Sequence, residues 1–234
     1  MSDKNISDYI DKAVCLTIEE RYDSWIELKE QCYLIGITPE IFLAGKKKSE
    51  NDTEVLDLFD HIDIDKLPPK YEESICYPSW WRFPHAFNAW ICHHKIIKKA
   101  FDEDVETLLL LEDDSEIMPD FQEIFEECRS FIDNNKWDML YLGWYSNGNL
   151  KKIDHKYIYK IEGGAGFHGV ILKRNVMKEL LKFNPVGPFD WICGKYIHNR
   201  YKCYAIYPSI IMQKDGISYI EGGGHLTKPE RNSK

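Results

Sequence analysis

The sequence feature that most constrains the fold is a run of four leucines, Leu108 to Leu111, followed at once by Glu112, Asp113 and Asp114. Four leucines are too few for a membrane span and too uniformly apolar for a half-exposed strand. They predict a central strand that is covered on both of its faces. Coverage on both faces is typical of an α/β fold, in which helices pack on each side of the sheet.

The acidic triplet at the end of this strand indicates a binding site. In open α/β sheets, ligands bind outside the carboxyl ends of the strands, and adjacent carboxylates repel one another unless a cation joins them. We therefore expect Glu112, Asp113 and Asp114 to bind a divalent metal. Oxygen ligands suit Mn²⁺ or Mg²⁺, and these ions suit phosphate-bearing substrates. An ordinary turn or a helix cap would explain the same residues without a ligand.

Length, charge and cysteine content narrow the classes of function. A chain of 234 residues can bury a substantial core, and no repeat or linker divides this one. The net charge of −9 argues against DNA or RNA as the partner. Neither a signal peptide nor a transmembrane segment is recognisable, so we expect a cytoplasmic protein, in the host cytoplasm if the source is viral. The seven cysteines form no Cys-x-x-Cys pair, which favours buried, reduced thiols.

Alternating apolar strands and amphipathic helices predict the order of the elements. Strands are expected at 12–18 and 40–44 with a helix at 20–33 between them, and a helix at 85–101 precedes the leucine run. Beyond the acidic triplet, the patterns predict helices at about 121–132, 175–183 and 190–200, and strands at 138–143, 157–161, 168–172 and 204–212. This alternation predicts a mainly parallel central sheet flanked by helices.

Three residues outside the triplet are candidates for a site, and each has an ordinary structural alternative. Asp190 opens a helix, so it is either a helix cap or a general base aimed into the cleft. Arg21 follows the first strand, where it could hold a phosphate or pair with a neighbouring acid. His93 lies on the apolar face of the helix at 85–101, where it is either a core residue or a side chain that orients a ligand group.

Taken in order, these landmarks resemble glycosyltransferase family 25, a GT-A family that includes lipooligosaccharide and collagen β-galactosyltransferases. The resemblance covers most of the chain and rests on the following segments: Leu16 to Arg21, Ala44-Gly45, Cys92-His93, Leu110 to Asp114, Asp138 to Gly143, Gly166 to Val170, Pro188 to Trp191, and Pro208 to Gln213. The chain departs from the family pattern at two places. Cys92 stands where the family has serine, and Ser218-Tyr219 stands where the family has Ser-Asp.

The resemblance implies a single GT-A-like, Rossmann-type domain over residues 1–234, with a nucleotide-sugar half at about 10–115 and an acceptor half at about 116–234. It implies a Mn²⁺ or Mg²⁺ site at Glu112, Asp113 and Asp114 with His225 as a further ligand. Residues implied for the nucleotide sugar are Leu16, Thr17, Arg21, Ala44, Gly45 and His93. Those implied for the sugar or the acceptor are Trp191, His168 and Gln213.

The function expected from this resemblance is metal-dependent transfer of a hexose, with galactose as the first candidate, from a UDP-sugar to a hydroxyl of a glycan or glycoprotein. We expect the reaction to invert the anomeric centre, with Asp190 as the general base that takes the proton of the acceptor hydroxyl. Two alternatives stay open. One is an inactive protein that only binds sugar nucleotides, and the other is a metal-dependent phosphohydrolase.

Overall fold

The computed structural model describes residues 4–44, 84–144, 150–163, 166–183, 189–217 and 225–226. Its centre is an eight-stranded sheet in the order β2-β1-β3-β8-β5-β9-β7-β6. Six of these strands run in one direction, whereas β7 and β8 run in the other. The strands are β1 (Lys12–Thr17), β2 (Glu40–Leu43), β3 (Thr107–Glu112), β5 (Met139–Tyr141), β6 (Leu150–Lys152), β7 (Ile158–Ile161), β8 (Val170–Lys173) and β9 (Cys203–Ile206).

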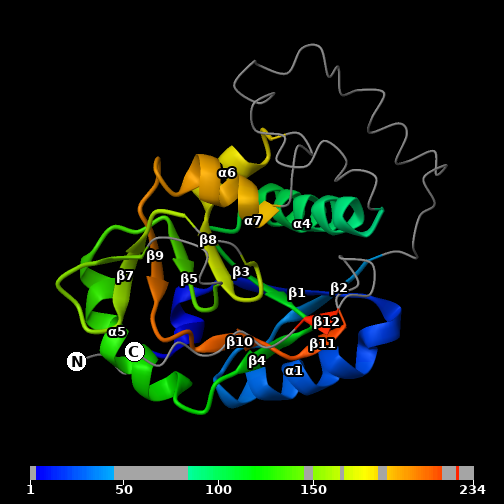
Figure 1. The fold of residues 1–234 in the computed structure, drawn as a ribbon, viewed down its shortest axis with the longest axis horizontal. Coiled ribbons are helices and arrows are strands. Elements are labelled where there is room, and N and C mark those ends of the chain that lie inside the picture. The colour runs from blue at the N-terminus through cyan, green and yellow to red at the C-terminus, as the bar shows by residue number, and fades with distance from the viewer. Residues whose placement is uncertain are drawn as a thin grey trace.

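Helices cover both faces of the sheet (Figure 1). One face carries α4 (Pro84–Asp102), α6 (Arg174–Leu180) and α7 (Phe189–Ile192). The other carries α1 (Tyr22–Leu34), which follows the short 3-10 helix η2 (Glu19–Arg21), and α5 (Phe121–Asn134). A further 3-10 helix, η1 (Ile6–Tyr9), precedes β1. The predicted α/β class, with a mainly parallel sheet between helices, is confirmed.

Strand β3 is buried on both faces, as the four leucines predicted. Leu108 and Leu110 pack in the apolar cluster under α4 and α6, while Leu109 and Leu111 pack in the cluster with α1 and α5. Each of the four side chains is at most 1% exposed. Because successive side chains of a strand point to opposite faces, this alternation also sets the direction of Glu112 at the end of β3.

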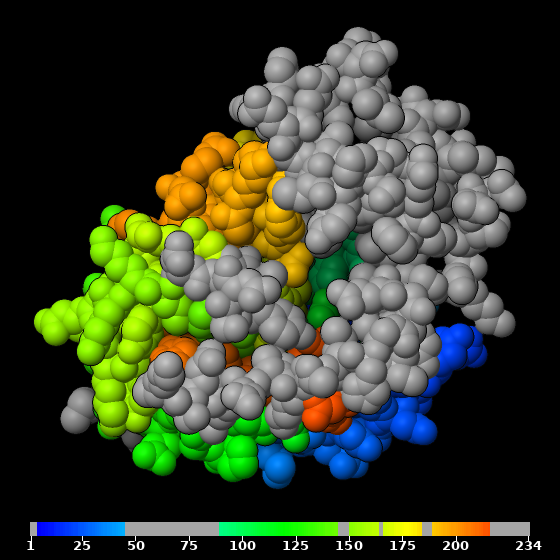
Figure 2. Space-filling view, viewed as in Figure 1, coloured from blue at the N-terminus to red at the C-terminus, as the bar shows by residue number. Residues whose placement is uncertain are grey.

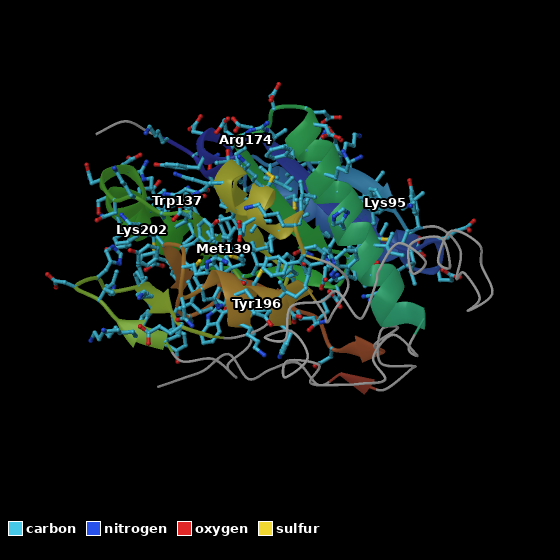
Figure 3. All side chains as sticks on the ribbon, turned by 90° about the horizontal axis from the view of Figure 1, so that it is seen from above. Lys95, Trp137, Met139, Arg174, Tyr196 and Lys202 are labelled. Carbon is cyan, nitrogen blue, oxygen red and sulfur yellow. The ribbon has the colours of Figure 1, made fainter. Side chains whose placement is uncertain are left out.

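Helices α4 and α6 lie beside each other across the sheet, as the view from above shows (Figure 3). Arg174, at the start of α6, joins them. Its guanidinium donates a hydrogen bond to the carbonyl of Phe101 at 2.8 Å and lies over the ring of the same residue at 4.1 Å. This contact fixes α6 against the C-terminal turn of α4.

Two expected elements differ from the structure. The strand expected at 204–212 is divided, because β9 ends at Ile206 and the chain then passes through the cis peptide Tyr207–Pro208. Pro208 has no backbone N–H and cannot continue a ladder of hydrogen bonds. The second piece, β10 (Ile211–Gln213), pairs instead with a strand that was not expected, β4 (Ser115–Ile117). The helix expected at 190–200 is α7 followed by a π-helical turn, Cys193–Ile197.

Two segments of the family resemblance, Gly45 and Ser218-Tyr219, lie outside the described ranges. Two small strands near the C-terminal end of the description, β11 (Gly216–Ile217) and β12 (His225–Leu226), pair with each other. All six described cysteines are buried, as predicted. In the part of the chain that the structure describes, no helix has the length and apolar character that a membrane span requires.

Candidate functional site

The carboxyl ends of β1, β2 and β3 meet at one edge of the sheet. The three strands are parallel neighbours, with β1 in the middle. Beyond their ends, the backbone N–H of Asp113 donates to the carbonyl of Leu16 at 3.1 Å, and that of Ala44 donates to the carbonyl of Thr17 at 2.8 Å. The structure therefore brings these four expected site residues together at the edge where α/β sheets bind their ligands.

Glu112 and Asp113 point to opposite faces of the sheet. Glu112 lies toward α4, with its Oε1 3.3 Å from Nε2 of His93. On the other face, Asp113 accepts a hydrogen bond from the Thr17 hydroxyl at 2.6 Å and lies 3.1 Å from Nη1 of Arg21. Burial raises the pKa of both carboxyls, that of Asp113 to about 6, although His93 and Arg21 favour the charged forms. Each carboxylate is thus held by partners of its own.

Asp114 has a buried carboxylate oxygen without a hydrogen-bond partner among the described residues. Its Oδ2 accepts a hydrogen bond from Nε2 of Gln213 at 2.7 Å and lies 3.7 Å from Nη1 of Arg21. Its Oδ1 is buried and has no hydrogen-bond partner among the described residues. A buried anionic oxygen without a partner is costly, and a cation at this position would remove the cost. The donor set of Asp114 therefore fits a hard divalent metal such as Mn²⁺ or Mg²⁺.

The described ranges contain no group of three or more His, Cys, Asp or Glu side chains arranged to enclose a metal. Magnesium-like ions need no such cage, because one or two carboxylates usually hold them while substrate phosphates and water complete the shell. The backbone of His225, the fourth expected ligand, pairs in β12, and its side chain lies outside the description. The geometry thus fits a metal held chiefly through Asp114.

Asp190 lies in the first turn of α7, and both of its oxygens are engaged. Oδ2 accepts a hydrogen bond from the backbone N–H of Gly166 at 3.1 Å, and Oδ1 accepts one from the N–H of Trp191 at 2.7 Å. Besides burial, the negative charges of Asp114 and Asp190 help to raise the pKa of Glu112, so these carboxyls share one electrostatic environment. The two hydrogen bonds of Asp190 are therefore compatible with a place beside the acidic residues.

Aromatic rings hold α7 against α4 next to this acidic group. The ring of Phe189 lies 5.2 Å from Trp90 and 5.9 Å from His93, while His93 lies 5.3 Å from Phe167. In the space-filling view, the orange surface that includes α7 adjoins the dark green surface of α4 (Figure 2). His93 thus lies between aromatic rings on one side and the carboxylate of Glu112, 3.3 Å from its Nε2, on the other.

The expected sugar or acceptor residues have different environments. His168 is buried, and burial lowers its pKa to about 4, so its ring is neutral at physiological pH. It packs against Gly143, where a Cβ atom would lie 2.6 Å from Cδ2 of the imidazole. The ring of Trp191 is partly buried and lies 6.2 Å from that of Tyr196 and 4.9 Å from Nζ of Lys195. Of the three, Gln213 alone has a described bond to the acidic triplet.

Sequence reasoning missed the contribution of β10 to this site. The backbone N–H of Lys214 donates to the carbonyl of Asp114 at 2.6 Å, and Gln213 is the strand partner of Ser115. The only signal for this arrangement in the sequence is Pro208, which marks a break in the expected strand. Gly143 was likewise read as a strand end rather than as a point of close packing.

Comparison with known proteins identifies a family. The sequence model of the GNT-I family matches residues 49–223, more than half of the chain. Over 93 residues the chain is 34% identical to an alpha-1,3-mannosyl-glycoprotein 2-beta-N-acetylglucosaminyltransferase of Arabidopsis thaliana. This match covers 39% of the chain and 21% of that relative, so the chain spans only a small part of the relative's length.

Two solved structures are also similar. A197 from STIV has a TM-score of 0.44 at 13% identity, covering 94% of this chain and 92% of that one. A glycosyltransferase involved in the glycosylation of the major capsid of PBCV-1 has a TM-score of 0.41 at 12% identity, covering 83% and 81%.

The comparisons confirm the prediction that the chain is a glycosyltransferase. They give no support to family 25 specifically. The matching family model includes the acidic triplet, Asp190 and Gln213 within its range of 49–223. Because this model spans more than half of the sequence, the chain belongs to the GNT-I family of glycosyltransferases.

Proposed function

We propose that this chain is a metal-dependent enzyme that transfers a sugar from a UDP-sugar to a hydroxyl group of a glycan or glycoprotein. The observation that carries the proposal is Asp114, whose buried Oδ1 is without a partner in the described structure at the carboxyl edge of the sheet. A nucleotide-sugar diphosphate bound at this edge with a divalent cation would satisfy that oxygen. The family to which the chain belongs supports transfer over hydrolysis.

The donor sugar is proposed from the relative's name. That name describes an N-acetylglucosaminyltransferase that acts on an alpha-1,3-mannosyl-glycoprotein. We therefore place UDP-N-acetylglucosamine first among the donors to be tested, ahead of the UDP-galactose that the resemblance to family 25 suggested. The acceptor is proposed to be a glycan, alone or on a protein.

The first requirement of this reaction is to stabilise the negative charge on the leaving diphosphate. A divalent metal bound at Asp114 would stabilise the negative charge that develops as the sugar–phosphate bond breaks. Arg21 adds a second positive charge at the same edge, since its Nη1 lies 3.7 Å from Oδ2 of Asp114. Asp113 and the Thr17 hydroxyl that bonds to it hold this guanidinium from the buried side.

Removal of the acceptor proton is the second requirement, and Asp190 is the proposed general base. Backbone N–H groups of Gly166 and Trp191 fix the orientation of its two oxygens. Attack by the acceptor on the side of the sugar opposite to the departing diphosphate would invert the anomeric configuration. The ring contacts of the neighbouring Phe189 with Trp90 and His93 keep α7 in place during this step.

A donor screen tests the proposal. The full chain is incubated with UDP-, GDP- and CMP-sugars, with Mn²⁺ or with EDTA, and thermal shift and nucleotide release are both recorded. We expect one UDP-sugar to give a shift and a slow release, both lost in EDTA and in Asp114→Ala. The exposed Asp102, which pairs with Lys98 on α4, supplies the matched control Asp102→Ala, in which both signals should persist.

Other results of the screen would contradict the proposal. Binding of a sugar nucleotide without release, even after glycan acceptors are added, would identify an inactive binding protein. Release of phosphate from simple esters without any acceptor would identify a phosphohydrolase. A thermal shift that is the same in EDTA and in Mn²⁺ would remove the metal from the mechanism.

A further inference from the structure

Gln213 and Asp114 form a part-buried, hydrogen-bonded pair at the edge of the candidate site. Gln213 is 7% exposed, and its Nε2 donates to Oδ2 of Asp114 at 2.7 Å. An ionised carboxylate only accepts hydrogen bonds, so the amide must present its NH₂ group to Asp114, and its Oε1 is directed elsewhere. Both Oε1 of Gln213 and Oδ1 of Asp114 are buried without a hydrogen-bond partner in the described part of the chain. Two linked side chains with unsatisfied acceptors need donors or a cation, and a cation suits the anionic oxygen of Asp114.

Strand β10 also holds the backbone that directly follows the Asp114 side chain. Gln213 pairs with Ser115 in the antiparallel register of β10 and β4, and the N–H of Lys214 donates to the carbonyl of Asp114 at 2.6 Å. β10 is itself attached to the main sheet, because the N–H of Ile211 donates to the carbonyl of Leu142 at 3.0 Å. The position of Asp114 relative to the sheet is therefore set by β10.

The side-chain bond decides which oxygen of Asp114 is free. The terminal torsion of an aspartate is broad, so the carboxylate turns readily when nothing holds it. Arg21 is the alternative partner, since its Nη1 lies 3.7 Å from Oδ2 and also pairs with Asp113 at 3.1 Å. Without the amide, Asp114 would turn toward this guanidinium, and an ion pair would then compete with a metal for the same carboxylate.

We propose that Gln213 is a positioning residue for the metal ligand Asp114. It occupies Oδ2, keeps the carboxylate from closing onto Arg21, and so leaves Oδ1 directed at the cation before the metal arrives. This inference rests on the proposed function. It places Gln213 at the metal site instead of in the sugar or acceptor contacts that the sequence suggested.

Binding of Mn²⁺ to the full chain tests the inference without any turnover. The electron paramagnetic resonance signal of free Mn²⁺ is titrated with protein, once with Mn²⁺ alone and once with Mn²⁺ and UDP. Gln213→Leu removes the amide, and we expect it to weaken Mn²⁺ binding about 10- to 100-fold, the usual effect of losing a side chain that orients a metal ligand. Gln213→Met, which is unbranched, replaces it if the leucine variant does not fold in thermal unfolding.

Gln31→Leu is the matched control. Gln31 accepts a hydrogen bond from the N–H of Ile117 at 2.8 Å, so it holds the same strand, β4, from the side of α1 and has no described bond to Asp114. Its Mn²⁺ binding should be unchanged. Equal weakening in the Gln31 and Gln213 variants, or no weakening in the Gln213 variants, would overturn the inference while the metal site stands. If the unaltered chain binds no Mn²⁺ with or without UDP, the metal step of the proposed function is itself overturned, and the inference with it.

Discussion

Asp113 is a charged side chain in a buried position, and its neighbours explain how it is tolerated. The Thr17 hydroxyl donates to it at 2.6 Å, and Arg21 lies 3.1 Å away. In Asp114, one residue later, Oδ2 accepts a hydrogen bond from the amide of Gln213, whereas Oδ1 has no hydrogen-bond partner in the described structure. At the scale of single residues, we infer that Asp113 orients Arg21 while Asp114 meets the metal. Burying a charge is affordable only with partners of this kind.

Asp190 is the residue for which a substitution tests chemistry most directly. Asp190→Asn keeps the size of the side chain and an oxygen that can accept the hydrogen bond from Gly166. Because an amide cannot take up the acceptor proton, we expect kcat to fall by a factor on the order of 10² or more. Affinity for the donor should be retained, because the proposed donor contacts lie at the triplet. Steady-state kinetics with the donor identified by the screen would measure both quantities.

The surface variant Asp102→Asn serves as the control for this substitution, since Asp102 is exposed and pairs only with Lys98 among its described ion pairs. Turnover of Asp190→Asn close to that of the control would remove Asp190 from the role of base.

At the scale of elements, the site depends on two short strands, β4 and β10, that lie outside the main sheet. The sequence could predict the long elements, such as α5, because an apolar stripe repeats over several turns. A strand of three residues is too short to show a period of two, and all three residues of β10 are buried. Its pairing with β4 joins residues almost a hundred positions apart, for which no local pattern exists. The role of Gln213 was therefore beyond the reach of the sequence.

The substitution Gly143→Ala tests how closely β10 must pack against the main sheet. A Cβ atom at this position would lie 2.6 Å from Cδ2 of His168 and would also meet the carbonyl of Ile211. Since the backbone of β10 cannot move without disturbing its partners, we expect Gly143→Ala to lower the free energy of unfolding by about 1–3 kcal/mol. Urea denaturation would measure this change.

Gly169, just before β8, offers a comparison, because it also packs against β10. The three atoms nearest to a Cβ atom there would be side-chain atoms of Ile211, each at 3.1 Å, so a smaller shift would relieve the contact than at Gly143. Gly169→Ala should therefore cost less than Gly143→Ala. Equal costs for the two substitutions would show that the backbone of β10 is not the constraint.

At the scale of the whole molecule, two apolar clusters enclose the sheet and bury polar groups with it. His198 is fully buried under the π-helical turn, where its Nε2 lies 2.9 Å from the hydroxyl of Tyr141. Burial lowers the pKa of His198 to about 4. The sequence predicted the α/β layers, because alternating patterns are local. It did not predict the burial of His198, because that depends on how the residue after the π-helical turn packs against Tyr141 of β5.

The buried His198 predicts a dependence of stability on pH. The folded state disfavours protonation of this ring, whose pKa is 6.5 when unperturbed and about 4 in the fold. Its contribution to stability is therefore complete above pH 6.5 and is lost as the pH falls through 6.5 toward 4. At about 1.4 kcal/mol for each unit of pKa, the loss amounts to roughly 3 kcal/mol.

His198→Gln removes this titration while keeping a polar partner for Tyr141. Urea unfolding at several pH values between 7.5 and 4 should show a shallower fall in the variant than in the unaltered chain. The raised pKa of Asp113 acts in the opposite direction in part of this range, but it is present in both proteins and cancels in the difference. Parallel pH profiles for the two proteins would mean that His198 does not titrate between folded and unfolded states as described.

The opposite facing of Glu112 and Asp113 has a consequence for how substitutions in this segment are compared. Exchanging these two residues would leave the composition, the net charge and the local hydropathy unchanged. The exchange would nevertheless place the longer side chain against Thr17 and Arg21 and the shorter one toward His93, so that neither would fit its partners. The order of the carboxylates carries the information here, and a scoring scheme that treats acidic residues as interchangeable would miss it.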